Sequence, residues 1–216
     1  ADMAIRGALT TAGTNKPLAI LDMGAGSTDA SIINGEGEIK SIHLAGAGNM
    51  VTLLIQSEMG LDSFDTAEDN KKYPLARMES MFHIRHENGA VEFFESPLDP
   101  RNFAKVVILK EGNMIPLEGD HSMARIKLIR KMAKEKVFIT NAIRALTPVS
   151  PTGHVRDIPF VVLVGGSALD FEVPQLVTDA LSHFKVVAGR GNIRGTEGPR
   201  NAVATGLVLS MGEEGR

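Results

Sequence analysis

Short apolar runs separated by glycine-rich turns make up the first sixty residues of the chain. Three of these runs are predicted to be β-strands, over residues 18–22, 28–33 and 38–44. Asn-Gly at 34–35 opens the turn between the last two, which favours a tight hairpin. A helix is predicted over 49–59, because Met50, Leu53 and Leu54 recur at helical spacing.

A change in composition marks residues 61–120, which are richer in charge and in phenylalanine. Turn sequences at 87–90 and 110–113 indicate hairpins, so we expect an inserted, mostly β region. A long helix is predicted over 121–146, stopped by Pro148 and Pro151. Its apolar stripe is Ile126, Ile129, Ala133 and Val137, and Lys127, Arg130, Lys131 and Lys134 are expected to form a solvated basic face.

The last third of the chain alternates between strands and helices. The run at 158–166 is apolar almost throughout and ends in Gly-Gly, which is typical of a buried parallel strand. Helices predicted over 171–184 and 198–211 flank a short strand at 185–188. Three neighbouring strands followed by alternating helices and strands predict an α/β fold, with a mixed β-sheet and flanking helices.

One domain with an insertion is the predicted organisation of the 216 residues. Residues 1–16 are small and polar and are expected to be a connector, so that the domain covers 17–216. The chain starts with alanine and opens in the middle of a pattern, which leads us to expect a piece of a longer protein.

Composition excludes several classes of protein. Without cysteine, the chain has no disulfide framework, cysteine nucleophile or thiolate-held iron–sulfur cluster, and a reducing cytoplasm is its simplest location. The net charge of −3 gives no indication of a nucleic-acid partner. No apolar run is long enough to span a bilayer, so no membrane partner is expected. The six histidines form no metal-binding pattern, since His83 and His86 point to opposite faces of a predicted strand.

Candidate chemistry begins at the end of the first predicted strand, in the sequence "LDMGAGSTDA" at 21–30. Glycine permits positive φ angles and close approach of a ligand, and successive N–H groups in such a turn can bind an anion. A carboxylate beside phosphates is reasonable if it holds Mg²⁺ or a water molecule, which makes Asp22 the candidate metal-linked residue. The alternative is an ordinary hairpin whose Asp and Ser side chains cap the turn.

A second glycine motif follows the buried strand, where Gly165 and Gly166 precede Ser167. Ligands of open α/β sheets bind at the carboxyl ends of strands, so both glycine motifs are expected at one edge of the sheet. A flat ring can lie against the bare backbone of Gly165 and Gly166. The alternative is a tight turn between strand and helix with no ligand.

These motifs resemble a known superfamily. "LDMGAGSTDASII" is similar to the second phosphate motif of the actin, sugar kinase and heat-shock chaperone ATPases, and "VVLVGGSALDFEVPQLV" is similar to their adenosine motif. "RNAVATGLVLS" resembles their last connecting helix, with Ala204 and Gly206 as its small residues. Over residues 3–210 the chain most resembles the large subunit of diol or glycerol dehydratase reactivases.

The resemblance implies an actin-like ATPase lobe that binds ATP or ADP with Mg²⁺. Such reactivases are chaperone-like ATPases that release damaged cobalamin from diol or glycerol dehydratase, in partnership with a small subunit. The superfamily site lies between two lobes, and the sequence contains the glycine hairpin of one lobe alone. Three rival interpretations are a small-molecule kinase lobe, an activator of radical dehydratases, which the absence of cysteine disfavours, and an interaction module with structural glycines.

The resemblance and the local chemistry together give the candidate site residues. Asp22 is expected to orient the attacking water or a metal-bound water, and Asp29 to cap the loop. The phosphate cradle comprises Gly24, Ala25, Gly26, Ser27 and Thr28. The helix start that offers N–H groups to anions or ribose oxygens comprises Gly46, Ala47, Gly48 and Asn49. Lys136 and Thr140 are expected to face the adenosine, and Arg190 and Arg194 lie either at a partner site or in a flexible turn.

Overall fold

The computed structural model describes residues 2–11 and 18–214. These residues form two compact units. The first unit contains the chain up to Met50 and again from Lys134 onward, and the second contains Val51–Ala133. The insertion expected over 61–120 therefore belongs to a larger unit, which also takes in most of α2 (Gly48–Met59) and α4 (Met123–Lys134).

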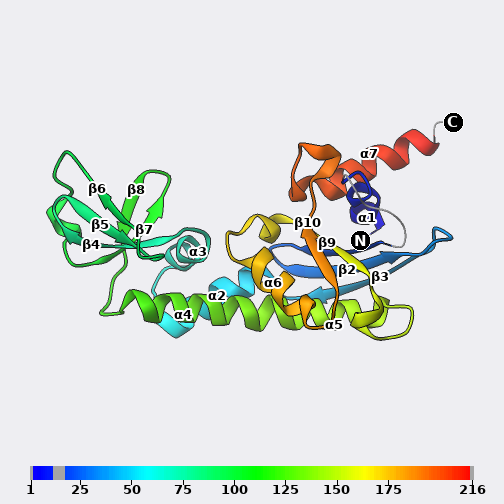
Figure 1. Ribbon diagram of the computed structural model, residues 1–216, viewed down its shortest axis with the longest axis horizontal. Coiled ribbons are helices and arrows are strands. Elements are labelled where there is room, and N and C mark those ends of the chain that lie inside the picture. The colour runs from blue at the N-terminus through cyan, green and yellow to red at the C-terminus, as the bar shows by residue number, and fades with distance from the viewer. Residues whose placement is uncertain (1, 12–17, 215–216) are drawn as a thin grey trace. The chain divides into compact units, whose positions relative to one another are not determined.

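A five-stranded mixed sheet is the centre of the first unit (Figure 1). Its strands are β1 (Leu18–Met23), β2 (Ser27–Ile33), β3 (Ile39–Ala45), β9 (Phe160–Val164) and β10 (Val187–Arg190), in the order β10-β9-β1-β2-β3. β1, β2 and β3 are antiparallel, whereas β1, β9 and β10 run parallel. The predicted mixed sheet is confirmed, with the first three strands within one residue of their expected limits.

Helices cover both faces of this sheet (Figure 1). α1 (Asp2–Ala8) and α7 (Ala202–Glu214) lie on one face, and α5 (Thr140–Val149) and α6 (Val173–Ser182) lie on the other. Alternate residues of a strand point to opposite faces. Leu18 and Ile20 accordingly pack with Ala4, Ile5 and Ala202 in one core, beneath α1 and α7.

α1 lies in the segment that was expected to be a connector. A Cβ atom at Gly7 would come within 1.8 Å of the carbonyl oxygen of Ala202, and one at Gly206 within 1.8 Å of that of Met3. The two helices therefore approach so closely that only glycine fits at these two positions. Residues 2–8 of the expected connector form this helix, and residues 1 and 12–16 of it lie outside the described part of the chain.

The predicted long helix exists as one helical stretch from Met123 to Val149. α4 continues into a π-helical turn, η2 (Glu135–Ile139), and then into α5. Pro148 does not stop the helix as expected, but lies within its last turn. At that position proline removes one backbone hydrogen bond, to the carbonyl of Arg144. This loss at the end of the helix is small enough for the helix to reach Val149.

The second unit is built on an antiparallel sheet of its own, in the order β6-β5-β4-β7-β8. The strands are β4 (Leu75–Ser80), β5 (His83–His86), β6 (Val91–Phe93), β7 (Val106–Lys110) and β8 (Asn113–Pro116), which confirms the mostly β prediction. Helix α3 (Phe64–Lys72) precedes the sheet. Ala76, Met78, Ile84 and Val107 form its buried centre.

Short 3-10 turns connect several of these elements. They are η1 (Pro100–Asn102), η3 (Val155–Asp157), η4 (Gly166–Leu169), η5 (Ile193–Gly195) and η6 (Pro199–Asn201). η4 follows β9 directly, and η6 leads into α7. Neither these turns nor the longer helices of the described residues offer a segment long and apolar enough to cross a bilayer.

Candidate nucleotide-binding site

The two glycine motifs meet at one edge of the first unit's sheet. Asp22 lies near the carboxyl end of β1 and is paired with Val164, the last residue of β9. Gly165 follows at once, and a Cβ atom placed on it would be 2.3 Å from Oδ1 of Asp22. The Ser167 hydroxyl donates a hydrogen bond of 3.0 Å to the carbonyl of Gly24. Residues 143 positions apart are thus held side by side at the edge where α/β sheets bind ligands.

Gly165 is required by the backbone as well as by the close approach. Its φ of 90° and ψ of 173° lie in a region that is essentially restricted to glycine. Gly166 differs, because it has no positive φ, it is exposed, and a Cβ there would meet only the side chain of Arg200. The turn therefore combines one glycine that the fold needs with one that leaves an open, flat surface.

The hairpin loop between β1 and β2 is held by the start of α2. The carbonyl oxygens of Gly24, Ala25 and Gly26 accept hydrogen bonds from the N–H groups of Gly48 (3.2 Å), Asn49 (2.8 Å) and Gly46 (2.8 Å) respectively. These three N–H groups were expected to bind anions or ribose oxygens, and that expectation is corrected here. Their hydrogen-bonding capacity is used to fix the loop, as is required of the buried amides of Gly46 and Gly48.

Two amides of the loop remain available for an anion. Ala25 and Gly26 are both exposed, and their N–H groups make no hydrogen bond within the part of the chain that the structure describes. Successive N–H groups at a turn can bind a phosphate oxygen. The phosphate-binding capacity of the predicted cradle is therefore concentrated in these two residues.

The hydroxyl groups of the predicted cradle are occupied within the protein. Thr28 is fully buried and donates a 3.0 Å hydrogen bond to the carbonyl of Gly46, which also accepts one of 2.8 Å from the amide of Asn141. Ser27 donates to Oδ2 of Asp29 at 3.2 Å. Thr28 is therefore a structural residue, contrary to the prediction. Asn141, which the sequence analysis missed, supports the loop from α5.

Two carboxylates face each other at this edge. Asp22 and Asp29 are direct partners in the β1–β2 register, so their side chains lie on the same face of the sheet. Burial, and secondly the charge of Asp29, raise the pKa of Asp22 above its usual value. Asp29 is hydrogen-bonded to His43 and Ser27, not to the loop backbone that it was expected to cap.

Asp22 is the one carboxylate here that fits a metal-linked role. Among residues 2–11 and 18–214, no three or more His, Asp or Glu side chains gather to form a metal-binding group. Asp29 has His43 and Ser27 as partners already. The chemistry of the donors therefore fits a magnesium ion that takes one protein ligand here and its other oxygen ligands from phosphate and water.

The two residues predicted to face the adenosine are not tied to the glycine motifs. Lys136 and Thr140 are exposed on η2 and at the start of α5. Neither side chain makes a hydrogen bond or an ion pair with another residue that the structure describes. Their assignment stays a prediction.

The basic face predicted for α4 is wrong at two positions. Arg130 and Lys134 are completely buried. Lys134 donates to Asp170 Oδ1 (2.8 Å) and Glu172 Oε2 (2.7 Å), and its ammonium lies 4.7 Å from the centre of the Phe171 ring. A buried charge is tolerated because carboxylates and hydrogen bonds compensate it.

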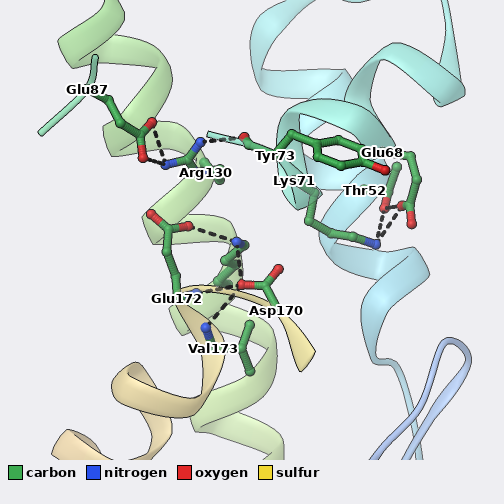
Figure 2. Close-up of polar contacts among 10 residues, drawn as sticks. Thr52, Glu68, Lys71, Tyr73, Glu87, Arg130, Asp170, Glu172 and Val173 are labelled. Carbon is green, nitrogen blue, oxygen red and sulfur yellow. Dashed lines mark hydrogen bonds and ion pairs between the residues drawn. The ribbon is translucent and has the colours of Figure 1, made fainter. Parts of the chain in front are cut away.

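Lys134, Asp170, Phe171 and Glu172 form a cluster, called here the Lys134 cluster. Its last three residues follow the glycine turn at 165–167 in sequence and are hydrogen-bonded to it through Asp170. Asp170 Oδ1 also accepts from the N–H groups of Glu172 (2.9 Å) and Val173 (3.1 Å) at the start of α6, as Figure 2 shows. The N–H of Asp170 donates to the carbonyl of Ser167 at 3.2 Å. Lys134 is thus connected through Asp170 and Ser167 to the carbonyl of Gly24, a route that the sequence analysis did not detect.

The family described as diol dehydratase reactivase ATPase-like domain matches residues 1–211. The chain belongs to this family. It is 65% identical over 214 residues to the propanediol dehydratase-reactivating factor large subunit of Salmonella typhimurium. The match covers 99% of this chain and 35% of that protein. The chain thus spans about a third of the length of the curated relatives that it matches.

Solved structures agree with the family assignment and define the fold class. A diol dehydratase-reactivating factor in nucleotide-free form matches with a TM-score of 0.93 and 65% identity, over 98% of this chain and 35% of that one. MreB5 of Spiroplasma citri bound to ADP matches at 0.56 and 22% identity, covering 97% of this chain and 57% of that one. Ta0583, an archaeal actin homologue, matches at 0.55 and 14% identity, covering 98% and 54%. The predicted actin-like ATPase fold is confirmed, and the relatives support the reactivase interpretation over the kinase alternative.

Proposed function

We propose that this chain is the nucleotide-binding lobe of an ATP-dependent reactivating factor that releases damaged cobalamin from diol or glycerol dehydratase. The observation that carries the proposal is the meeting of Asp22 with Gly165 at the carboxyl edge of the sheet. A half-buried carboxylate, two free loop amides and a bare glycine surface there match the three parts of a nucleotide, which are metal-bound phosphate, phosphate oxygen and a flat base.

Each residue has a distinct part in the proposed site. The N–H groups of Ala25 and Gly26 donate to a phosphate oxygen, and the Gly166 surface receives the adenosine. Asp22 orients a water molecule for attack on the terminal phosphate or holds a water of the metal shell. Mg²⁺, when bound, neutralises charge on the phosphates. The hydrogen bonds from Gly46, Gly48 and Asn49 keep the loop in its binding shape.

The wider proposal concerns partners and location. The relatives' names describe large subunits of dehydratase-reactivating factors, so a small subunit and a diol or glycerol dehydratase are the proposed partners. The damaged cobalamin leaves the dehydratase, and no part of this chain is proposed to bind it. The proposed location is the cytoplasm, because a chain without cysteine needs no oxidising compartment to form disulfides.

Two measurements test this function. In the longer parent protein, ATP is expected to restore activity to glycerol-inactivated dehydratase, and Asp22→Asn is expected to slow ATP hydrolysis far more than it weakens ATP binding. Equal turnover by wild type and Asp22→Asn would contradict the role of Asp22. Rescue that needs no ATP would contradict the proposed function as a whole.

The chain by itself gives a second test. All the proposed contacts lie on one unit, so ADP is expected to bind weakly, with a Kd between about 0.1 mM and 1 mM, or roughly −4 to −5.5 kcal/mol. ATP hydrolysis should not exceed background, since a one-sided site does not exclude water from the phosphates. Calorimetry and phosphate release measure these quantities, and tight binding with steady turnover would show that the site is complete within this chain.

A further inference from the structure

An arginine that the sequence analysis did not select lies beside the bare surface of Gly166. Nη2 of Arg200 is 3.7 Å, and its Nε 3.9 Å, from the position that a Cβ atom would take at Gly166. Arg200 is exposed on η6. Within the part of the chain that the structure describes, its side chain makes no hydrogen bond and no ion pair. A planar cation is therefore placed against the surface proposed to receive the adenosine.

The backbone holds Arg200 at this position. The N–H of Gly165 donates a 3.0 Å hydrogen bond to the carbonyl of Pro199, the residue before Arg200. Pro199 is buried, and proline restricts the backbone at the start of η6. The location of Arg200 beside Gly166 thus follows from a direct link between η6 and the glycine turn.

Arg194 provides a contrast within the same segment. It forms an ion pair of 3.7 Å with Glu197, three residues later. Arg200 has no such partner among the described residues, although both side chains are exposed. Arginine is suited to base recognition because its guanidinium is planar, always charged and weakly hydrated, and it stacks on aromatic faces.

We propose that Arg200 is a nucleotide-contacting residue whose guanidinium stacks on the purine base bound at the Gly165–Ser167 turn. This proposal rests on the nucleotide-binding function proposed above. The base is the favoured contact, because Arg200 adjoins Gly166, whereas Asp22 and the free amides of Ala25 and Gly26 mark the phosphate end of the site. Arg200 lies far along the chain from either glycine motif, and its role depends on the folded arrangement.

The test uses three ligands that separate base from phosphate: ADP, adenosine and pyrophosphate. Each is titrated by NMR, which detects millimolar affinities, against the wild-type chain, Arg200→Ala, Arg200→Lys and the matched control Arg194→Ala. Arg200→Ala is expected to weaken ADP and adenosine about five- to tenfold, the effect of losing about 1 kcal/mol of stacking, and to leave pyrophosphate unchanged. Arg200→Lys should lose nearly as much, because an ammonium has no plane to stack.

The outcomes distinguish this proposal from the function on which it rests. Full ADP affinity in Arg200→Lys, with weaker pyrophosphate binding in Arg200→Ala, would assign Arg200 to the phosphates and overturn the stacking. Unchanged ADP affinity in Arg200→Ala, together with a loss in Gly166→Val, would remove Arg200 from the site and leave the nucleotide function standing. Failure of the folded wild-type chain to bind ADP and adenosine would overturn both. Circular dichroism confirms that each variant is folded.

Discussion

Arg130 and Lys134 are two buried cations one helical turn apart on α4, and they bind different parts of the chain. Nη2 of Arg130 donates to both carboxylate oxygens of Glu87, at 2.9 and 3.0 Å, and Nη1 reaches the carbonyl of Tyr73 at 3.4 Å. These contacts lie wholly within the second unit. Lys134 binds Asp170 and Glu172, which lie in the first unit directly after the glycine turn.

The difference shows how one helix face can serve two purposes. The Arg130 guanidinium presents several N–H groups, so that one nitrogen donates to both oxygens of Glu87 and another to the Tyr73 carbonyl, whereas the lysine ammonium is a compact charge that can bind two carboxylates and lie over a ring. Arg130 therefore stabilises the inserted sheet near Glu87. Lys134 stabilises the segment that starts α6 and follows Ser167, so we expect its loss to affect the proposed nucleotide site as well as folding.

The largest effect is expected for Lys134→Met. This change leaves Asp170 and Glu172 without their buried counter-charge, which should lower the free energy of unfolding by about 4–5 kcal/mol. Urea unfolding measures the loss, and Arg125→Met, at an exposed position on the same helix, is the matched control with an expected change within about 0.5 kcal/mol. A loss below 1 kcal/mol in Lys134→Met would show that the buried cluster contributes little.

A somewhat smaller effect is expected for Arg130→Met, about 3 kcal/mol, because the largely buried carboxylate of Glu87 loses its counter-charge. Hydrogen exchange should show faster opening in the strands of the second unit, while β1 and β9 stay protected. The double variant Arg130→Met with Glu87→Leu should recover most of the loss, because the unpaired carboxylate is gone. Equal deprotection of β1 and β9 would break the contrast between the two cations.

The turn beside the Lys134 cluster offers a third comparison, between adjacent glycines. Gly165→Ala should cost about 2–3 kcal/mol, because of its φ of 90° and the contact with Asp22 and the carbonyl of Met23. Gly166→Ala should cost less than about 1 kcal/mol, since only the flexible Arg200 side chain is near. Thermal unfolding of both variants measures the two losses of stability. Equal losses would mean that the turn adapts to a side chain at either position.

Local pattern was sufficient for much of the fold. The Asn34-Gly35 turn and the apolar runs around it located β1, β2 and β3, and helical spacing located α2. α1 was missed because its helix depends on contact with α7, almost two hundred residues later, through Gly7 and Gly206. Such packing leaves no periodic signal in a segment of small residues.

The site was harder to predict than the fold. The motifs indicated Asp22 and Gly165 because carboxylates and glycines at strand ends have a local meaning. The helix-start amides were assigned to a ligand, although they bind the carbonyls of Gly24, Ala25 and Gly26. Charge spacing on α4 could not separate buried from solvated cations, because the partners of Arg130 and Lys134 lie more than thirty positions away.

The smallest expected effect has the opposite sign and concerns Asp22. Its pKa is raised above the usual 3.8, so the folded protein holds this proton more tightly than the unfolded chain. The stability contributed by the protonated carboxyl is complete below the unfolded pKa and is lost as the pH rises through the folded pKa. At pH 7 the ionised Asp22 opposes folding, because it is half-buried and directly opposite Asp29.

Asp22→Asn should therefore raise the free energy of unfolding at pH 7, by up to about 1 kcal/mol, and the gain should disappear at pH 3. Urea unfolding at both pH values measures the difference, with Asp62→Asn, at an exposed site, as the control. A neutral residue that stabilises the fold where an acid weakens it is the behaviour expected of a carboxylate retained for chemistry, and a loss of stability in Asp22→Asn at pH 7 would make Asp22 a structural residue instead.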